Sequence, residues 1–131
     1  MANAFFDSDD LAILAIDTPD LSRVTDMSSM FYGAANLTGN FSGWDTSNVT
    51  NMAGMFAEAG NFNQPLSSWN TSNVTDMSFM FAYAHNFNQD LSARTVTGVT
   101  DMTSMFDFAT HFSTYNYNAI LHSRSQQAVK S

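Results

Sequence analysis

Cysteine, positive charge and long apolar runs are what this 131-residue sequence lacks or has little of. It contains no cysteine, which excludes a disulfide framework, a cysteine-ligated metal site and a thiol nucleophile. Only four residues are basic, against twelve that are acidic, and the net charge is −8. Because there is no basic stripe to neutralise phosphates, nucleic acid and anionic lipid are poor partners.

No apolar run approaches the length that spans a membrane. The segment 11–16 is also too short for the core of a usual signal peptide, and it follows acidic residues. We therefore expect no membrane insertion by this chain. If the natural protein is exported, we expect its signal or anchor to lie outside this sequence.

Phenylalanine and methionine make up an unusual part of the apolar content, with 12 Phe and 9 Met in a hydrophobic share of 44%. This share and the chain length are enough for one domain with a buried core. Charged residues make up only 12% of the sequence. The composition therefore predicts a globular, weakly charged domain.

The sequence repeats itself with a period of 25 residues. The units cover residues 24–48, 49–73, 74–98 and 99–114, and the last is incomplete. A fixed period of this length is typical of architectures in which each unit stacks on the next. We therefore predict a repeat domain over residues 24–114, with three full coils and one partial coil.

The positions that recur in every unit are mostly apolar and fall at i, i+3, i+4 and i+7, which is the spacing of one helix face. They predict a short helix at the start of each coil. One coil cannot bury this face alone, so like residues should form ladders through a stacked core, each contributing roughly 1.5–3 kcal/mol. At this spacing a core is favoured over a cofactor site, and no cofactor is expected. The predicted ladders are Met27, Met52, Met77 and Met102, with Phe31, Phe56, Phe81 and Phe106.

An Asp or Asn precedes each apolar stripe: Asp26, Asn51, Asp76 and Asp101. Their side-chain oxygens can accept hydrogen bonds from free N–H groups at a helix start, worth about 1 kcal/mol each. Calcium binding is the alternative, but Ca²⁺ takes six to eight oxygens and usually several carboxylates. Half of the Asp and Asn candidates at repeat starts and turns are Asn, so capping is favoured and no metal site is assigned.

The second part of each unit has a different pattern. Phe62, Leu66 and Trp69 are spread along a stretch that predicts a short strand, and the links 45–48 and 70–73 consist of turn-forming residues. One helix, one strand and one turn in each unit predict an α/β repeat fold, a solenoid of the leucine-rich-repeat kind with parallel strands.

Both ends depart from the repeat, as the ends of a stack should. We predict that residues 1–23 form an N-terminal cap. We predict that residues 115–131 form a C-terminal capping helix, which covers the last coil with Ile120, Leu121 and Val129.

Two strings carry a family resemblance: NVTNMAGMFAEAGNFNQPLSSWNTS at 48–72 and NVTDMSFMFAYAHNFNQDLS at 73–92. They resemble the repeat of BspA-type leucine-rich-repeat surface proteins, which is also found in mycoplasma surface lipoproteins, and the likeness covers residues 24–112. It implies a right-handed solenoid displayed on or outside a microbial cell, with a role in adhesion to host matrix proteins and other cells. It carries over no catalytic residue. The third unit departs from the pattern at Arg94, Thr95, Val96 and Gly98.

Signs of catalysis are weak. His85, His111 and His122 show neither a His-x3-His spacing nor a pairing with Glu, and the serines lack the G-x-S-x-G elbow of hydrolases. We therefore predict that the chain is not an enzyme, and a secreted hydrolase is the unfavoured rival.

A polar, nearly uncharged strip is predicted along the strands. It consists of Asn63, Gln64 and Ser67 in the second unit and Asn88, Gln89 and Ser92 in the third. A solvated face and a recognition surface are equally compatible with it, because flat repeat surfaces are common binding sites. Regular hydroxyls and amides would also suit an ice or glycan binder.

The sequence therefore predicts a non-catalytic binding or adhesion module, located outside the cell or at its surface. Its expected ligand is a protein or glycan on a host, a neighbouring cell or a matrix. The alternatives are a structural spacer and a calcium-dependent or ice-binding repeat.

Overall fold

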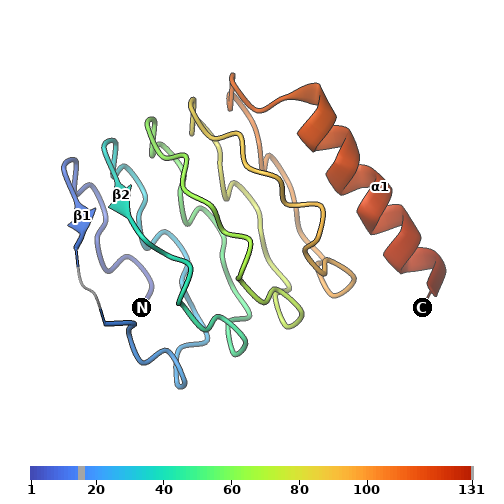
Figure 1. Cartoon of the computed structure of the whole chain (residues 1–131), viewed down its shortest axis with the longest axis horizontal. Helices are drawn as coiled ribbons and strands as arrows, with labels where there is room; N and C mark the ends of the chain where they lie inside the picture. Colours follow the sequence, from blue (N-terminus) through green and yellow to red (C-terminus); the bar gives the residue numbers. More distant parts are fainter. Residues whose placement is uncertain (15–16, 131) are drawn as a thin grey trace.

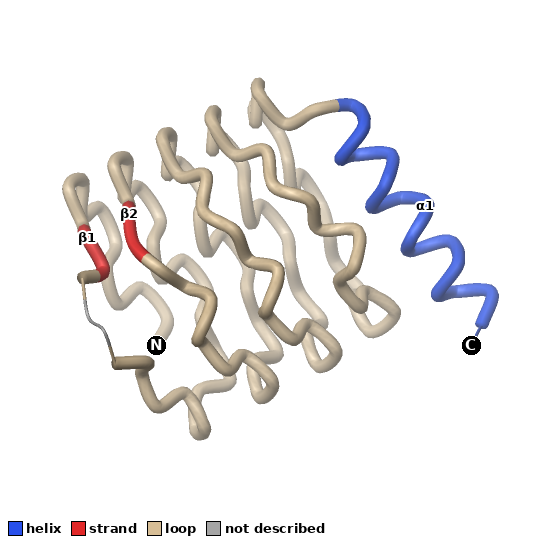
Figure 2. The backbone as a smooth tube through the Cα atoms, viewed as in Figure 1, coloured by secondary structure: helices blue, strands red, loops and turns tan. Residues whose placement is uncertain are grey.

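The computed structural model of the chain describes residues 1–14 and 17–130 (Figure 1). The backbone winds into coils that lie side by side, one for each repeat unit and one more formed by residues 1–23. Strands β1 (Ala12–Ile13) and β2 (Thr38–Gly39) belong to the first two coils, and helix α1 (Thr114–Lys130) follows the last coil. Turns and loops make up most of the coils (Figure 2).

Backbone hydrogen bonds at alternate residues hold each coil to the next. In the first unit, the N–H groups of Ser29 and Phe31 donate to the carbonyl groups of Ala53 and Met55, at 2.8 and 2.9 Å. Met30, which lies between them, instead bonds within its own coil, because its N–H group donates to the carbonyl of Met27 at 3.2 Å. The same alternation recurs in the second and third units.

The prediction of a short helix in each unit is wrong. In an α-helix every N–H group donates to the carbonyl four residues back, whereas here every second N–H group donates to the neighbouring coil. Residues in the left-handed region, such as Ser29 (φ 51°) and Gly33 (φ 71°), further prevent a helix. Residues 28–33 therefore form successive turns. Within the described residues, α1 is the only helix.

The prediction of one short strand per coil is also wrong. β1 and β2 pair in parallel, Ala12 with Thr38 and Ile13 with Gly39, and the described residues contain no other strand. In later coils an amide side chain replaces the backbone acceptor, because the N–H of Asn88 donates to Oδ1 of Asn63 at 3.0 Å. Parallel pairing otherwise continues as isolated bridges that link Asp26, Asn51, Asp76 and Asp101 in turn.

The four Asp and Asn residues expected to cap helices make the expected kind of hydrogen bond, but at the start of turns. Oδ1 of Asp26 accepts the N–H of Ser28 at 2.8 Å, and Oδ1 of Asn51 accepts the N–H of Ala53 at 2.9 Å. Asp76 and Asp101 do the same. Such bonds are characteristic of Asx-turns, which compete with helix formation.

Residues 1–23, predicted as a separate cap, repeat the structure of the units. The N–H groups of Phe5 and Asp7 donate to the carbonyl groups of Met30 and Tyr32 at 2.9 and 2.7 Å, and the ring of Phe5 stacks on that of Phe31. Residues 15–16, the end of the short apolar run, lie outside the described residues. The N-terminal segment is therefore a further coil.

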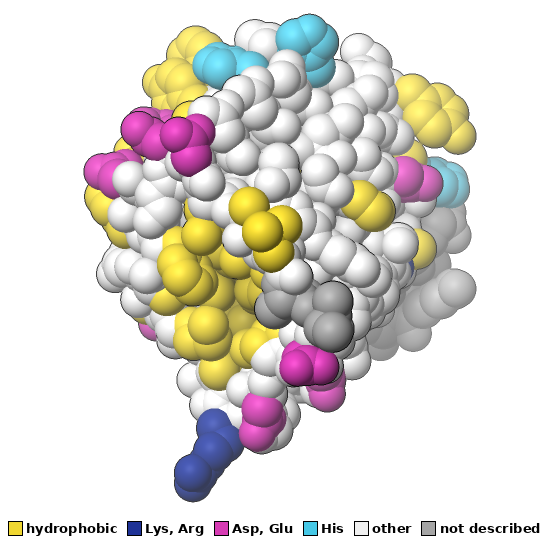
Figure 3. Space-filling model, turned by 60° about the vertical axis from the view of Figure 1, so that its left-hand side comes forward, with side chains coloured by type: hydrophobic (Ala, Val, Ile, Leu, Met, Phe, Trp, Pro, Cys, Tyr) yellow, Lys and Arg dark blue, Asp and Glu magenta, His cyan; other side chains and the backbone are white. Residues whose placement is uncertain are grey.

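The two ends of the stack differ. Helix α1 lies beside the last coil, with Ile120 buried and Leu121 about half exposed, while the side chain of Val129 is outside the described part. At the other end, apolar side chains gather in a hollowed area (Figure 3). This area includes Phe5, Ile13, Leu14, Met30 and Trp44.

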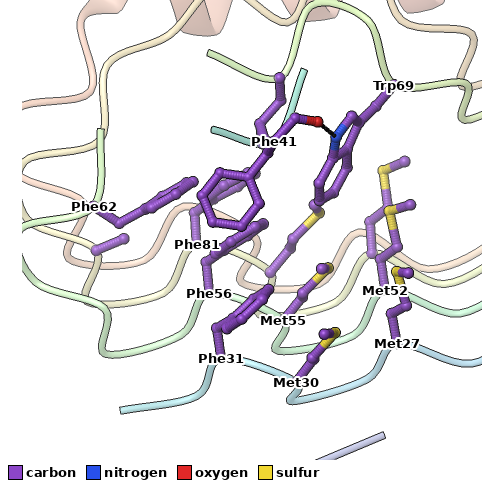
Figure 4. Close-up of a cluster of buried hydrophobic side chains, with 14 of the residues drawn as sticks. Met27, Met30, Phe31, Phe41, Met52, Met55, Phe56, Phe62, Trp69 and Phe81 are labelled. Atoms are coloured by element: carbon purple, nitrogen blue, oxygen red, sulfur yellow. Dashed lines mark hydrogen bonds between the residues drawn. The ribbon is translucent and has the colours of Figure 1, made fainter. Parts of the chain in front are cut away.

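Recurring apolar residues form the core as rows that run through the stack (Figure 4). The rings of Phe31, Phe56, Phe81 and Phe106 stack in succession, with centroids 5.6–5.7 Å apart. Met27, Met52 and Met77 are buried in the same way, and Met102 and Phe106 in the last coil are partly buried. Parallel stacking of like side chains thus fills the space between successive coils.

Candidate binding surface

The turn segments that begin each coil form one outer surface of the molecule, which we call the turn face. It comprises residues 2–7, 28–33, 53–58, 78–83 and 103–108. The inward side chains of these segments belong to the core, and the outward ones change from coil to coil. The turn face carries the acidic residues Asp7, Glu58 and Asp107 and contains no Lys or Arg.

Two pairs of stacked aromatic rings stand on the turn face. Phe6 stacks on Tyr32, and Tyr83 stacks on Phe108, each with ring centroids 4.7 Å apart. This distance matches the spacing of about 4.7–4.9 Å between hydrogen-bonded neighbours in a sheet, so each pair joins adjacent coils. Tyr83 and Phe108 are 44% and 62% exposed.

A shallow groove of about 320 Å³ lies between the aromatic pairs. Gly54, Ala57 and Ala82 lie in its lining together with the aromatic residues Tyr32, Phe79 and Tyr83, and with Ser28, Ser29, Ala53 and Glu58. We call it the turn-face groove. It exists because small residues in the third coil replace the aromatic residues that its neighbours carry.

Glu58 provides the negative charge of the groove. The hydroxyl of Tyr32 donates to Oε1 of Glu58. This hydrogen bond, more than burial or the nearby charges, raises the pKa of the Tyr32 hydroxyl. The bond orients both side chains at one edge of the groove.

Phe79 and Tyr83 adopt a backbone conformation that bulky residues rarely take. Their φ angles are 56° and 59°, in the left-handed region, where a non-glycine residue costs of order 1–3 kcal/mol. At the matching positions of other units the chain has Gly54 and Gly33. Phe79 is also 50% exposed, so neither its backbone nor its ring is placed where folding alone would favour it.

The predicted polar strip is used largely to join coils. Oδ1 of Asn63 accepts hydrogen bonds from the N–H of Asn88 and from Nε2 of Gln89, at 3.0 and 2.9 Å. Oδ1 of Asn88 in turn accepts from the N–H of Ser113 and from Nδ2 of Asn116, both at 2.9 Å. The side-chain amide oxygens of Asn63 and Asn88 are therefore engaged within the protein.

The other members of the strip lie near this ladder without forming one themselves. Ser67 is exposed, Gln64 is half-buried, and the N–H of Ser92 donates to Oδ1 of Asp90 at 2.8 Å. The structure thus brings Asn63, Asn88 and Gln89 into one hydrogen-bonded group. Among the described residues, it shows no comparable link to Ser67 or Gln64.

Two histidines of the sequence analysis also lie against the backbone of a neighbouring coil. Nδ1 of His85 is 2.9 Å from the carbonyl oxygen of Phe108, and Nδ1 of His111 is 2.8 Å from that of His85. His122 is exposed on α1. Among the described residues, no group of three or more His, Cys, Asp or Glu is placed to hold a metal ion.

Sequence reasoning missed the groove residues Tyr32, Glu58, Phe79 and Tyr83. A usable signal was present, because these residues are aromatic or charged side chains in columns that vary between units, whereas the core columns recur in every unit. No helix in the part of the chain that the structure describes has the length and apolar character to cross a membrane.

Comparison with known proteins identifies one family. The model of the family described as "Mycoplasma protein of unknown function, DUF285" matches residues 1–119. No curated protein and no solved structure matches the chain.

Proposed function

The chain belongs to the DUF285 family, and we propose that it is a non-catalytic binding module that recognises a protein or glycan through the surface of its coils. In this proposal the stack of coils is a right-handed solenoid. It acts outside the cell or at its surface, in adhesion to a host, a neighbouring cell or a matrix.

The observation that carries the proposal is the exposed aromatic cluster on the turn face. Phe79, Tyr83 and Phe108 are each exposed by 44% or more, and all three have positive φ angles. Exposed aromatic residues that gather around a groove are typical of recognition surfaces, where aromatic residues often dominate the binding energy. A structural spacer would have no need of them.

The use of the acidic side chains supports a binding module over an enzyme. Asp26, Asp45 and Asp101 accept hydrogen bonds from backbone N–H groups two residues further on. Hydrogen bonds from these residues hold the pKa of each carboxyl below its ordinary value, chiefly the side-chain bond from Ser47 for Asp45 and the backbone bonds from Ser28 and Thr103 for Asp26 and Asp101, and this keeps each carboxyl charged in a turn. A general acid would instead need a pKa near the working pH.

The resemblance to BspA-type surface proteins supports the proposed location and the adhesive role. It rests on the W-[DN]-T-S-N-V-T-[DN]-M junction at residues 44–52 and 69–77. The description of the family names no activity, so the ligand class must be inferred from the surface itself.

A binding screen tests the proposal. The purified chain would be applied to an array of matrix proteins and glycans, beside the variant Tyr83→Gly, which removes an exposed ring at a position where the first unit has Gly33. We expect at least one ligand that the wild type retains and the variant loses. If no ligand binds with a Kd below about 1 mM, corresponding to roughly −4 kcal/mol, the spacer replaces the binding module.

A further inference from the structure

Resting on that binding function, we propose that the turn-face groove is a site for the cationic side chain of a basic peptide segment, with arginine as the preferred residue. The site consists of aromatic walls around the carboxylate of Glu58.

The groove is about as wide as one side chain, because the third coil has small residues between the aromatic residues of the second and fourth coils. Tyr32 stands in the second coil and Phe79 and Tyr83 stand in the fourth, while the third coil has Ala57 and Gly54 at the positions that match Tyr32 and Phe79. Neighbouring coils are about 4.7–4.9 Å apart, so the two walls rise from backbones roughly 10 Å apart. This separation suits one extended side chain lying over a floor of small residues.

The chemistry of the lining favours a cation. Arginine and lysine are attracted to the faces of tyrosine and phenylalanine rings within about 6 Å. A carboxylate offers about four acceptor positions, and the hydrogen bond from the Tyr32 hydroxyl uses one of them on Glu58. A guanidinium group can therefore bond to Glu58 while its plane lies against a ring, which lysine cannot do as well.

Charge complementarity points to the same occupant. The turn face carries Asp7, Glu58 and Asp107 with no basic residue, and the whole chain has a net charge of −8. A basic segment would be attracted to this surface over a distance of about 8–10 Å at ordinary salt concentrations. An acidic partner would be repelled.

A glycan is the less suitable occupant. Sugars also stack on aromatic rings, but they present many hydroxyl groups that need polar partners. Apart from Glu58 and the hydroxyls of Tyr32, Tyr83, Ser28 and Ser29, the groove is lined by Gly, Ala and Phe side chains. Its lining therefore matches a methylene stem with one charged end better than it matches a sugar ring.

The repeat supplies variants that remove the site without harming the fold. Phe79→Gly and Tyr83→Gly copy the residues that the second and first units have at these positions, Gly54 and Gly33. Both changes relieve a left-handed non-glycine residue. Ser104→Gly is the matched control, because Ser104 is the left-handed residue equivalent to Phe79 in the last unit and carries no ring.

Calorimetric titration of the full chain tests the site. The probes are hexa-arginine, hexa-lysine, hexa-glutamate, a neutral Gly/Ser peptide and a set of neutral oligosaccharides. We expect hexa-arginine to bind more tightly than hexa-lysine. Phe79→Gly, Tyr83→Gly and Glu58→Gln should each weaken hexa-arginine binding by about tenfold, the size of one cation–π contact or charged hydrogen bond. Ser104→Gly should bind like the wild type.

The possible results separate this inference from the proposed function. If hexa-arginine binds equally to the wild type and the three groove variants, the attraction is a general effect of surface charge and the site is wrong. If oligosaccharides bind and the groove variants abolish that binding, the cationic ligand is wrong while the binding module stands. If neither these probes nor the array ligands bind, both the site and the proposed function fail. Thermal melting of each variant shows that any loss occurs in a folded protein.

Discussion

The inward and outward sides of the turn segments follow opposite rules. Inward, Phe31 and its equivalents are identical in every unit, because each ring must pack against the ring of the next coil. Outward, one column reads Ser29, Gly54, Phe79 and Ser104, although all four share the left-handed conformation. The comparison teaches that stacking preserves the repeat, while the sites of recognition should be sought where the repeat is broken.

The largest loss of stability should come from a substitution on the inward side of a turn segment. Phe56 stacks on Phe31 and Phe81 at 5.6 Å and on Phe62 at 4.2 Å, and it is fully buried. Phe56→Ala should lower the free energy of unfolding by about 3–5 kcal/mol, measured by urea denaturation. Phe108→Ala, on the outward side, should change it by less than about 1 kcal/mol. Equal losses in the two variants would contradict the contrast.

A smaller loss of stability should show that the predicted polar strip serves to hold the coils together and not to bind a ligand. Asn63→Ala removes the acceptor of two hydrogen bonds, from Asn88 and Gln89. We expect a loss of about 1–2 kcal/mol in the free energy of unfolding, with no change in binding to the array ligands. Ser67→Ala, which alters an exposed hydroxyl in the same strip, is the control and should be close to neutral. If Asn63→Ala were as stable as the wild type, the strip would not have this structural role and would again be a candidate binding surface.

Exchanging residues within the left-handed column should change stability in opposite directions. Gly54→Ala places a Cβ at φ 60°, 3.3 Å from Oγ of Ser29, and should lower the free energy of unfolding by about 1 kcal/mol. Phe79→Gly should leave it unchanged or raise it by up to about 1 kcal/mol, because relief of strain exceeds the entropy that glycine adds to the unfolded chain. Thermal melting of the two variants under one condition makes the comparison. A clear loss of stability in Phe79→Gly would show that the Phe79 ring contributes to folding.

The smallest change in stability per residue should come from the carboxylates that accept hydrogen bonds in the turns, those of Asp26 and Asp101. Hydrogen bonds from Ser28 and Thr103 lower the pKa of Asp26 and of Asp101 from the ordinary value of 3.8. A lowered pKa in the folded state means that the stabilisation is present above pH 3.8 and is lost as the pH falls through the folded-state pKa. Melting temperature should therefore decrease progressively below about pH 4.

Asparagine variants provide the control for this pH dependence. Asn51 makes the same turn bond at 2.9 Å without a charge, so Asp26→Asn and Asp101→Asn should keep the turns and flatten the decrease between about pH 4 and pH 2. An unchanged acid profile in the double variant would show that other carboxylates control the transition.

The period and the apolar columns of the core could be read from the sequence, but the local backbone could not. Met27, Met30 and Phe31 have the three- and four-residue spacing of a helix face, and successive turns produce the same spacing. Only the direction of alternate N–H groups distinguishes the two, and it depends on a neighbouring coil. A local pattern cannot report a bond whose acceptor lies 24 residues away.

The groove was hidden for a related reason. Left-handed positions are normally inferred from Gly or Asn, and Phe79 and Tyr83 give no such signal. The amides of Asn63 and Asn88 suggested a binding strip, because the sequence does not reveal that their oxygens replace backbone acceptors. The sequence of residues 1–23 does not show the 25-residue period because few side chains recur there, although Phe5 continues the row of stacked phenylalanines.

The unequal ends of the stack give the molecule a direction of unravelling. Helix α1 lies beside the last coil, whereas in the first coil Leu14 is 83% exposed and the core-facing Phe5 and Ile13 are only partly buried. In a linear array each coil is supported only by its neighbours, so local opening should begin at the N-terminal coil and advance inward. Amide hydrogen exchange would then form a gradient along the chain, fastest in residues 1–23 and slowest in the middle units.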